Sequence, residues 1–256
     1  KASIMQNLPR EIFKAYDIRG IAGKTLTPEV VEAIGHAIGS EAIARGQGTV
    51  AIGRDGRLSG PELIAALARG IRKSGIDVID VGCVPTPMVY FAAHHLNTRC
   101  AVMLTGSHNP PDYNGLKMVL ADETLSGEAI QQLRQRIEQD DLAHGRGNYS
   151  RQDISAAYIA RIVSDIRLAR PMKVTVDCGN GVAGAYVAEL YRQLGCQVNE
   201  MYCEVDGHFP NHHPDPSQPE NLRDLITALR DNDSELGLAF DGDGDRLGVV
   251  TKDGRI

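Results

Sequence analysis

The chain has 256 residues, which is enough for one large domain or two ordinary ones. Hydrophobic residues make up 42% of it and charged residues 23%, as in a soluble globular protein, and no apolar stretch is long enough to cross a bilayer. The formal net charge of −6 argues against nucleic acid as a main partner, and five cysteines without CxxC spacing predict reduced thiols in a cytoplasmic protein.

In the first half, apolar periodicity predicts alternating strands and helices. Thr27 as N-cap and Pro28 at the first helical position begin one helix, and Ser59 with Glu62 forms a capping box for a second. After a short segment ending at Gly20, we expect strands at 50–53, 76–81, 101–105 and 116–120, and helices at 27–42, 59–75, 86–96 and 126–139.

The second half repeats this order after a polar stretch at 140–150, where we place the domain linker. Strands are expected at 172–176, 198–202, 236–240 and 247–251, with helices at 182–194 and 220–230, the second capped by Ser217. We therefore predict an α/β fold of two similar domains, 1–150 and 151–256. Each is expected to be a mixed β-sheet of about four strands sandwiched between helices.

Each half carries a polar loop directly after its third strand. The first, Thr105–Lys117, reads TGSHNPPDYNGLK with Ser107 near its start, and the second, Asp241–Arg246, reads DGDGDR. Ligands of α/β domains bind at the carboxyl ends of strands, so these loops are the candidate functional sites. We expect the two loops to face each other.

Ser107 becomes a nucleophile only if a base, a metal or a prior phosphoryl group changes its chemistry. Thr105 and Asn109 stand where a GxSxG motif has glycines, which argues against a hydrolase elbow. A simple turn, in which Ser107 and Asn109 bond their own backbone, stays open. Lys117 is either an ordinary strand lysine or a group that binds phosphate or exchanges a proton.

The Asp241 loop is more specific. Aspartates at alternate positions, separated by glycines, place three carboxylates around one hard cation. An EF-hand loop has Gly at its sixth position and Glu at its twelfth. Counted from Asp241, these positions are Arg246 and Lys252, so an EF-hand is excluded. Solvent-facing aspartates in a turn are the alternative. Arg246 would offset their charge or contact a phosphate.

Two further stretches favour structural roles. Cys178–Gly181 lies between a strand and a helix but lacks GxGxxG and the P-loop lysine, which favours a tight connection over a phosphate site. The stretch 206–216 has three histidines, yet its prolines and the lack of spaced Cys/His partners favour a structural or interface loop over a zinc site.

Together these residues resemble the α-D-phosphohexomutase superfamily, in particular its bacterial phosphomannomutase/phosphoglucomutase branch. TGSHNPPDYNGLK matches the phosphoserine loop and DGDGDR the magnesium loop. The supporting matches occur in family order, and they are YDIRG (16–20), GRDGRLSG (53–60), CGNGVAG (178–184) and DGHFPNHHPDP (206–216). Members have four domains, and this chain matches the first two.

The resemblance implies that a phosphate on Ser107 is transferred to mannose or glucose 1- or 6-phosphate through a hexose 1,6-bisphosphate, which also serves as the phosphorylating activator. One Mg²⁺ per chain would be held by the serine phosphate and by Asp241, Asp243 and Asp245. Implied around the transferring phosphate are Arg19, Lys117 and Arg246, with Tyr16 and His108 nearby and Lys117 as the proton-exchanging group.

The resemblance also implies that the full-length parent is a monomer. Since the sugar-selecting third domain and the phosphate-binding fourth are absent here, this chain alone is expected to turn over poorly. Three other functions stay open. They are a phosphoglucosamine mutase, a metal-dependent phosphatase with an aspartyl nucleophile, and a non-catalytic module that binds Mg²⁺ and phosphate.

Overall fold

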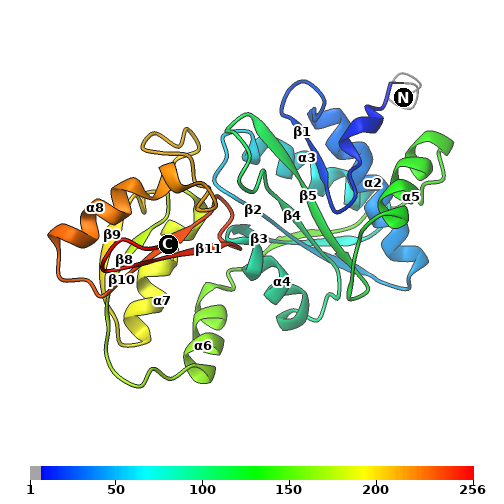
Figure 1. Ribbon diagram of the computed structural model, residues 1–256. Coiled ribbons are helices and arrows are strands. Elements are labelled where there is room, and N and C mark those ends of the chain that lie inside the picture. Colours follow the sequence, from blue (N-terminus) through cyan, green and yellow to red (C-terminus); the bar gives the residue numbers. More distant parts are fainter. Residues whose placement is uncertain (1–6) are drawn as a thin grey trace. The chain divides into compact units, whose positions relative to one another are not determined.

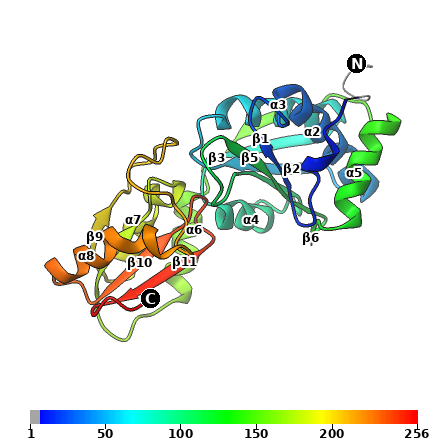
Figure 2. The same cartoon turned by 45° about the horizontal axis from the view of Figure 1, so that its top comes forward.

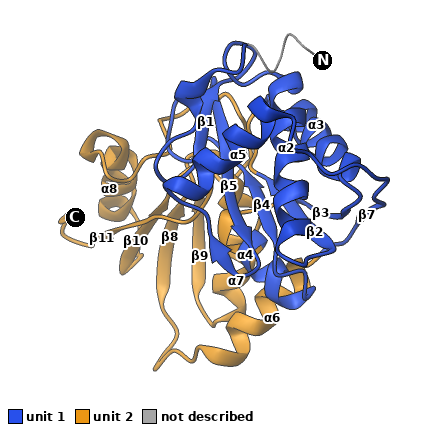
Figure 3. Ribbon diagram, turned by 90° about the vertical axis from the view of Figure 1, so that its right-hand side faces the viewer, with its two compact units in different colours: residues 1–54, 58–82, 89–153 blue, residues 55–57, 83–88, 154–256 orange. Residues whose placement is uncertain are grey.

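The structure is a computed structural model that describes residues 7–256. It divides into two compact units (Figure 3). Unit 1 comprises the chain up to Arg54 together with 58–82 and 89–153, and unit 2 comprises 55–57, 83–88 and 154–256. Within the described residues, every helix is too short or too polar to span a membrane.

Unit 1 is built on a seven-stranded sheet in the order β1-β5-β4-β2-β3-β7, with β6 paired to β5. Its strands are β1 (Ile18–Ile21), β2 (Thr49–Arg54), β3 (Asp77–Cys83), β4 (Ala101–Leu104), β5 (Tyr113–Leu120), β6 (Glu123–Thr124) and β7 (Tyr149–Arg151). Its helices are η1 (Arg10–Ile12), α2 (Pro28–Ala44), α3 (Gly60–Lys73) and α5 (Glu128–Gln139), together with α4 (Thr86–His95) apart from its first three residues, which belong to unit 2. Helices α2, α3 and α5 cover one face of the sheet, and α4 lies on the other (Figures 1 and 2).

Unit 2 has a four-stranded sheet in the order β11-β10-β8-β9. Its elements are α6 (Ser155–Asp165), β8 (Lys173–Asp177), η2 (Val182–Ala185), α7 (Val187–Gln193), β9 (Gln197–Met201), η3 (Pro219–Leu222), α8 (Arg223–Asp231), β10 (Leu236–Phe240) and β11 (Leu247–Thr251). Leu238 packs in the core cluster that includes α7, and Ala239 packs in the one that includes α8. Because neighbouring strand residues point to opposite faces, the two helices cover the two faces of the sheet.

The predicted repeat is confirmed by the strand order. Four strands of unit 1 have the order β5-β4-β2-β3, and the four strands of unit 2 have the order β11-β10-β8-β9. The two orders are the same when β2 to β5 are matched in chain order to β8 to β11. The last strand of each set pairs antiparallel with the third. The α/β fold class is therefore confirmed, and the first sheet is larger than expected because β1, β6 and β7 join it.

Of the three helix caps predicted from the sequence, one is present in the structure. Thr27 caps α2 as expected, since its Oγ1 accepts a hydrogen bond from the Val30 amide at 3.2 Å. The capping box at Ser59 is wrong, because its hydroxyl instead accepts from Asn114 Nδ2 at 2.9 Å and makes no cap bond. Ser217 does not cap α8 either, because its hydroxyl donates to Asp215 at 2.6 Å and a 3₁₀ turn precedes the helix.

The expected helix at 182–194 is divided into η2 and a shorter α7. The polar stretch 140–150 lies within unit 1 and is bonded to α3 through its backbone, as where the Gly145 amide donates to the Lys73 carbonyl at 2.8 Å. Its last residues enter β7, which pairs parallel with β3 and has no apolar periodicity that could have revealed it. Helix α6 was also missed, although its amphipathic sequence carries the helical signal.

Candidate active site

Ser107 lies in the turn that leaves β4, in unit 1. Its side chain is buried, and its backbone adopts φ 54°, a left-handed conformation that costs a non-glycine residue about 1–2 kcal/mol. The Ser107 amide donates to Thr105 Oγ1 at 2.7 Å, and Ser107 Oγ lies 3.3 Å from His108 Nδ1. The loop thus presents a serine hydroxyl beside a titratable ring.

Backbone bonds to the sheet hold this turn in place. The Thr105 amide donates to the Gly115 carbonyl at 3.0 Å, which ties the exit of β4 to β5. The Asn109 amide then donates to the Gly106 carbonyl at 2.9 Å and closes the turn. The strained residue therefore lies between two fixed points, which is how a left-handed serine persists in a folded protein.

Arg19 reaches the same loop from β1. Its Nη1 donates to Asn109 Oδ1 at 3.3 Å and its Nη2 pairs with Asp17 at 2.5 Å, with only 10% of the side chain exposed. Lys117 is half-buried on β5, opposite Met103 of β4. Tyr16 is 81% exposed, and its side chain makes no hydrogen bond with a described residue. Arg19 and His108 are thus brought to the loop of Ser107.

The three aspartates of the second loop follow β10 in unit 2. One carboxylate oxygen of each lies within 4.8 Å of the others, and among residues 7–256 no other group of three His, Cys, Asp or Glu residues converges in this way. Asp241 and Asp243 are fully buried and Asp245 is exposed. Asp241 Oδ1 accepts from the amides of Asp245 and Arg246, both at 3.1 Å.

The electrostatics of this loop favour a bound cation. Burial, together with the charges of Asp243 and Asp245, raises the pKa of Asp241 to about 8. Its Oδ2 is buried and accepts no hydrogen bond from the described residues, which is costly for a carboxylate oxygen. Clustered carboxylate oxygens are the ligands of a hard divalent cation, so the residues present fit a metal such as Mg²⁺.

Thr86 supports this loop and was missed in the sequence. Its Oγ1 donates to Asp243 Oδ2 at 2.6 Å, and its amide donates to the Asp243 carbonyl at 2.9 Å. Both residues belong to unit 2, although 157 positions separate them in the chain. No local pattern signals such a partner, because the pair exists only after the chain folds.

The turn Cys178–Gly181 packs against the aspartate loop from the neighbouring strand β8. The Val182 amide donates to the Gly242 carbonyl at 3.3 Å. A Cβ at position 181 would lie 3.0 Å from that carbonyl oxygen, which is closer than most Cβ contacts, so glycine favours this approach. The turn is a tight connection, as expected, and it supports the loop that carries the carboxylates.

Among the histidines of the 206–216 stretch, His212 is anchored beside β8. Its Nε2 lies 2.8 Å from an oxygen of Asp177, at the end of β8. Burial opposes a charge on this ring, but the hydrogen bond and the charge of Asp177 outweigh it, so the pKa of His212 is raised. The segment is therefore pinned to unit 2 by an ion pair, consistent with a structural loop.

Comparison with known proteins identifies the family. Residues 10–144 match domain I of the phosphoglucomutase/phosphomannomutase family, an alpha/beta/alpha domain, and residues 156–254 match its domain II. The chain belongs to this family. A phosphomannomutase/phosphoglucomutase of Pseudomonas aeruginosa is 60% identical over 249 residues, covering 97% of this chain and 54% of that protein.

Other family members extend the likeness. A phosphoglucomutase of Neisseria meningitidis is 58% identical, over 98% of this chain and 55% of its own. The crystal structure of a family protein from Burkholderia thailandensis has a TM-score of 0.95 at 53% identity, covering 98% of this chain and 56% of that one. The chain thus spans about half the length of the relatives it matches.

Family membership confirms the resemblance drawn from the two loops. It does not assign the individual residues. The roles of Ser107, His108, Arg19, Lys117, Arg246 and Tyr16, and of the three aspartates as ligands, remain predictions. Ser107 belongs to unit 1 and the aspartates belong to unit 2.

Proposed function

We propose that the protein is a phosphomannomutase/phosphoglucomutase, which moves a phosphoryl group between C1 and C6 of a hexose phosphate. The observation that carries this proposal is the 60% identity to a protein of that name over 249 residues. Both reactive loops lie within the matched family domains. The converging carboxylates of the second loop add independent support, since phosphoryl transfer depends on stabilising charge.

Ser107 is the proposed phosphoryl carrier. In the first half-reaction, the bond between Ser107 Oγ and phosphorus breaks and a hexose phosphate hydroxyl bonds to that phosphorus, giving a hexose 1,6-bisphosphate. In the second, Ser107 Oγ takes the other phosphoryl group, which restores the phosphoserine. Burial of the side chain supports this role, because a water-excluded loop limits loss of the phosphate to hydrolysis.

Cationic side chains would bind and orient the phosphate on Ser107. Arg19 is held rigidly beside the loop by its bonds to Asn109 and Asp17, which suits a guanidinium that binds phosphate oxygens. We assign Lys117 to exchange the proton of the attacking or leaving hydroxyl, Arg246 and Tyr16 to bind the phosphosugar, and His108 to a catalytic role near the transferring phosphate. Each of these assignments is carried over from the family resemblance.

Asp241, Asp243 and Asp245 are the proposed ligands of one Mg²⁺, with the phosphate on Ser107 as a further ligand. When bound, the ion withdraws charge from the transferring phosphate. The chain's own contribution is to hold buried carboxylates together despite their repulsion, through the bonds to Asp241 Oδ1 and from Thr86. We further propose mannose and glucose phosphates as substrates, hexose 1,6-bisphosphate as activator, and a cytoplasmic monomer.

Phosphate mapping tests the central residue. We expect incubation with glucose 1,6-bisphosphate and Mg²⁺ to add one phosphoryl group to the chain, found on the peptide that contains Ser107 and stable to hydroxylamine. Ser107→Ala should abolish it, and Ser126→Ala, an exposed serine of the same unit, should not. Hydroxylamine-labile phosphate on Asp241 or Asp243 would instead establish an aspartyl phosphatase.

A phosphoglucosamine mutase is the competing function within the family. A probable phosphoglucosamine mutase of Methanopyrus kandleri is 37% identical over 252 residues, well below the 60% of the Pseudomonas protein. The identities therefore favour mannose and glucose phosphates. Assay on mannose 1-phosphate and glucosamine 1-phosphate of a protein that joins this chain to the remaining domains of a relative separates the two, and a preference for the amino sugar would reverse our assignment.

A further inference from the structure

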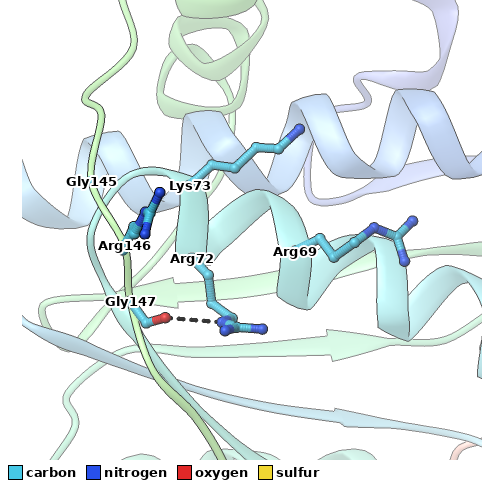
Figure 4. A pocket seen from close by; sticks show the side chains of 6 residues that line it. All are labelled: Arg69, Arg72, Lys73, Gly145, Arg146 and Gly147. Carbon is cyan, nitrogen blue, oxygen red and sulfur yellow. Dashed lines mark hydrogen bonds between the residues drawn. The ribbon is translucent and has the colours of Figure 1, made fainter.

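A basic pocket lies in unit 1, on elements that the proposed chemistry does not use. It has a volume of about 290 Å³ and is lined by the end of α3 and the segment that follows α5 (Figure 4). Four of its six lining residues are cationic, and the other two are glycines: Arg69, Arg72, Lys73, Gly145, Arg146 and Gly147. In a chain of net charge −6, such a concentration of positive charge is unusual.

Backbone contacts fix the walls of this pocket. The amides of Gly145 and Gly147 donate to the carbonyls of Lys73 and Arg72, at 2.8 and 2.9 Å. Arg72 Nε donates a hydrogen bond to the Gly147 carbonyl at 2.9 Å, as Figure 4 shows. A Cβ at position 147 would lie only 1.7 Å from the Ile76 carbonyl oxygen, so the segment lies flush against the chain that leaves α3. The position of Arg146 is therefore determined by the fold.

The cations exceed the acids that neutralise them. Glu32 of α2 pairs with both Arg69, at 3.2 Å, and Lys73, at 3.3 Å, so one carboxylate serves two cations. Within residues 7–256, neither Arg72 nor Arg146 forms an ion pair, and both are exposed. The pocket thus keeps an excess positive charge that faces solvent, where an anion can reach it.

Helix stability explains only part of this arrangement. Basic side chains in the last turn of a helix interact favourably with its dipole, which accounts for Arg72 and Lys73 at the end of α3. It does not account for Arg69, one turn earlier, or for Arg146 on a separate segment. Cations from two separate segments line one hollow, and this is the feature that needs a ligand.

We propose that this pocket binds a compact anion with two or more phosphate groups. A guanidinium group can donate two parallel hydrogen bonds to one phosphate group. Three of the four cations that line the pocket are arginines. The volume is at the lower limit of small-molecule sites, and no aromatic residue lines it, which disfavours a nucleotide base. A short polyphosphate or a small bisphosphate therefore fits better than a nucleotide or a neutral sugar.

Calorimetry with inorganic triphosphate tests this site in the 256-residue chain, at low salt and with EDTA so that no metal binds the probe. We expect saturable binding, weaker binding of inorganic phosphate, and a loss of about tenfold in affinity for Arg146→Gln and for Arg69→Gln. The charge-matched control Arg167→Gln, on an exposed arginine of unit 2, should bind as the wild type does.

Three outcomes would overturn the proposal. One is the absence of saturable triphosphate binding by the wild type. Another is an equal loss in Arg167→Gln and Arg146→Gln, which would show that the probe senses only overall charge. The third is binding that persists in Arg146→Gln and Arg69→Gln but is lost in Lys117→Gln, which would place the anion at the Ser107 loop.

Discussion

The Ser107 loop and the Asp241 loop occupy the same place in a repeated unit. Each follows the third strand of its set and leads into an antiparallel fourth strand. They are nevertheless strained in different ways. The first holds a serine at φ 54°, whereas the second buries two aspartates beside a third.

This difference shows what topology fixes and what the residues decide. The repeated strand order places a loop at the carboxyl end of the sheet in both units, which is where α/β proteins bind ligands. The residues then determine which free-energy cost each loop carries. It is an unfavourable backbone conformation in the loop of Ser107 and charge repulsion in the loop of Asp241. Substitutions that relieve each cost separately test this distinction.

Asp241→Asn should have the largest effect. The amide keeps the shape and can still accept the bonds from Asp245 and Arg246. It replaces a group whose pKa is raised to about 8, so that on folding it must either take up a proton or carry a buried charge beside two other aspartates. We expect unit 2 to gain about 2 kcal/mol in free energy of unfolding in EDTA, and to lose the extra stability that Mg²⁺ gives the wild type. Thermal unfolding with EDTA and with Mg²⁺ measures both.

Asp245→Asn is the matched control for this substitution, because Asp245 is exposed and its charge is screened by water. It should gain less stability in EDTA than Asp241→Asn does. A variant Asp241→Asn that is less stable than the wild type in EDTA would show that charge repulsion is not the dominant cost of this loop.

Thr86→Val should have the next largest effect. Valine keeps the shape of threonine but removes the hydroxyl that donates to Asp243 Oδ2, so this carboxylate is less well oriented. We expect Mg²⁺ affinity to fall by about tenfold, as with other groups that orient a metal ligand. Thr86→Ser, which keeps the hydroxyl, should bind Mg²⁺ nearly as the wild type does. Equal losses in calorimetry for the two variants would assign the effect to packing.

The sequence predicted the two loops and the α/β repeat well, because both depend on local signals. The strand at 236–240 and its partner at 247–251 were placed at their observed bounds, since apolar runs flank the aspartate loop directly. Helix α2 was predicted from Thr27 and Pro28, and the cap bond to Val30 is present. Local chemistry decides these features.

Features that depend on distant contacts were not predictable. Ser59 has the sequence of a helix cap, yet Asn114, 55 positions away, binds its hydroxyl. Thr86 supports Asp243 across 157 positions. The left-handed backbone of Ser107 could not be predicted from the sequence either, because nothing in Gly-Ser-His distinguishes a left-handed serine from an ordinary turn. Tertiary contacts outweighed local preference in each case.

Ser107→Gly relieves the strain of the first loop. Glycine adopts a left-handed backbone without steric cost, whereas alanine does not. We expect Ser107→Gly to exceed Ser107→Ala by about 1 kcal/mol in free energy of unfolding of unit 1, measured by chemical denaturation. Both variants lose the hydroxyl, so they differ only in the Cβ and in the backbone conformations that it restricts. Equal stabilities would mean that the φ of 54° carries no cost in this turn.

The ion pair of Asp177 and His212 gives the smallest expected effect, and it concerns the strand next to the aspartate loop. The pKa of His212 is raised, so its stabilising charge is complete below the unfolded-state value near 6.5 and is lost as pH rises through the higher folded-state pKa. His212→Gln should therefore destabilise unit 2 more at pH 6 than at pH 8.5, by about half a kcal/mol. A difference that is constant with pH, or larger at pH 8.5, would mean that His212 holds the segment as a neutral ring. The contact between the 206–216 segment and the end of β8 would then be independent of charge.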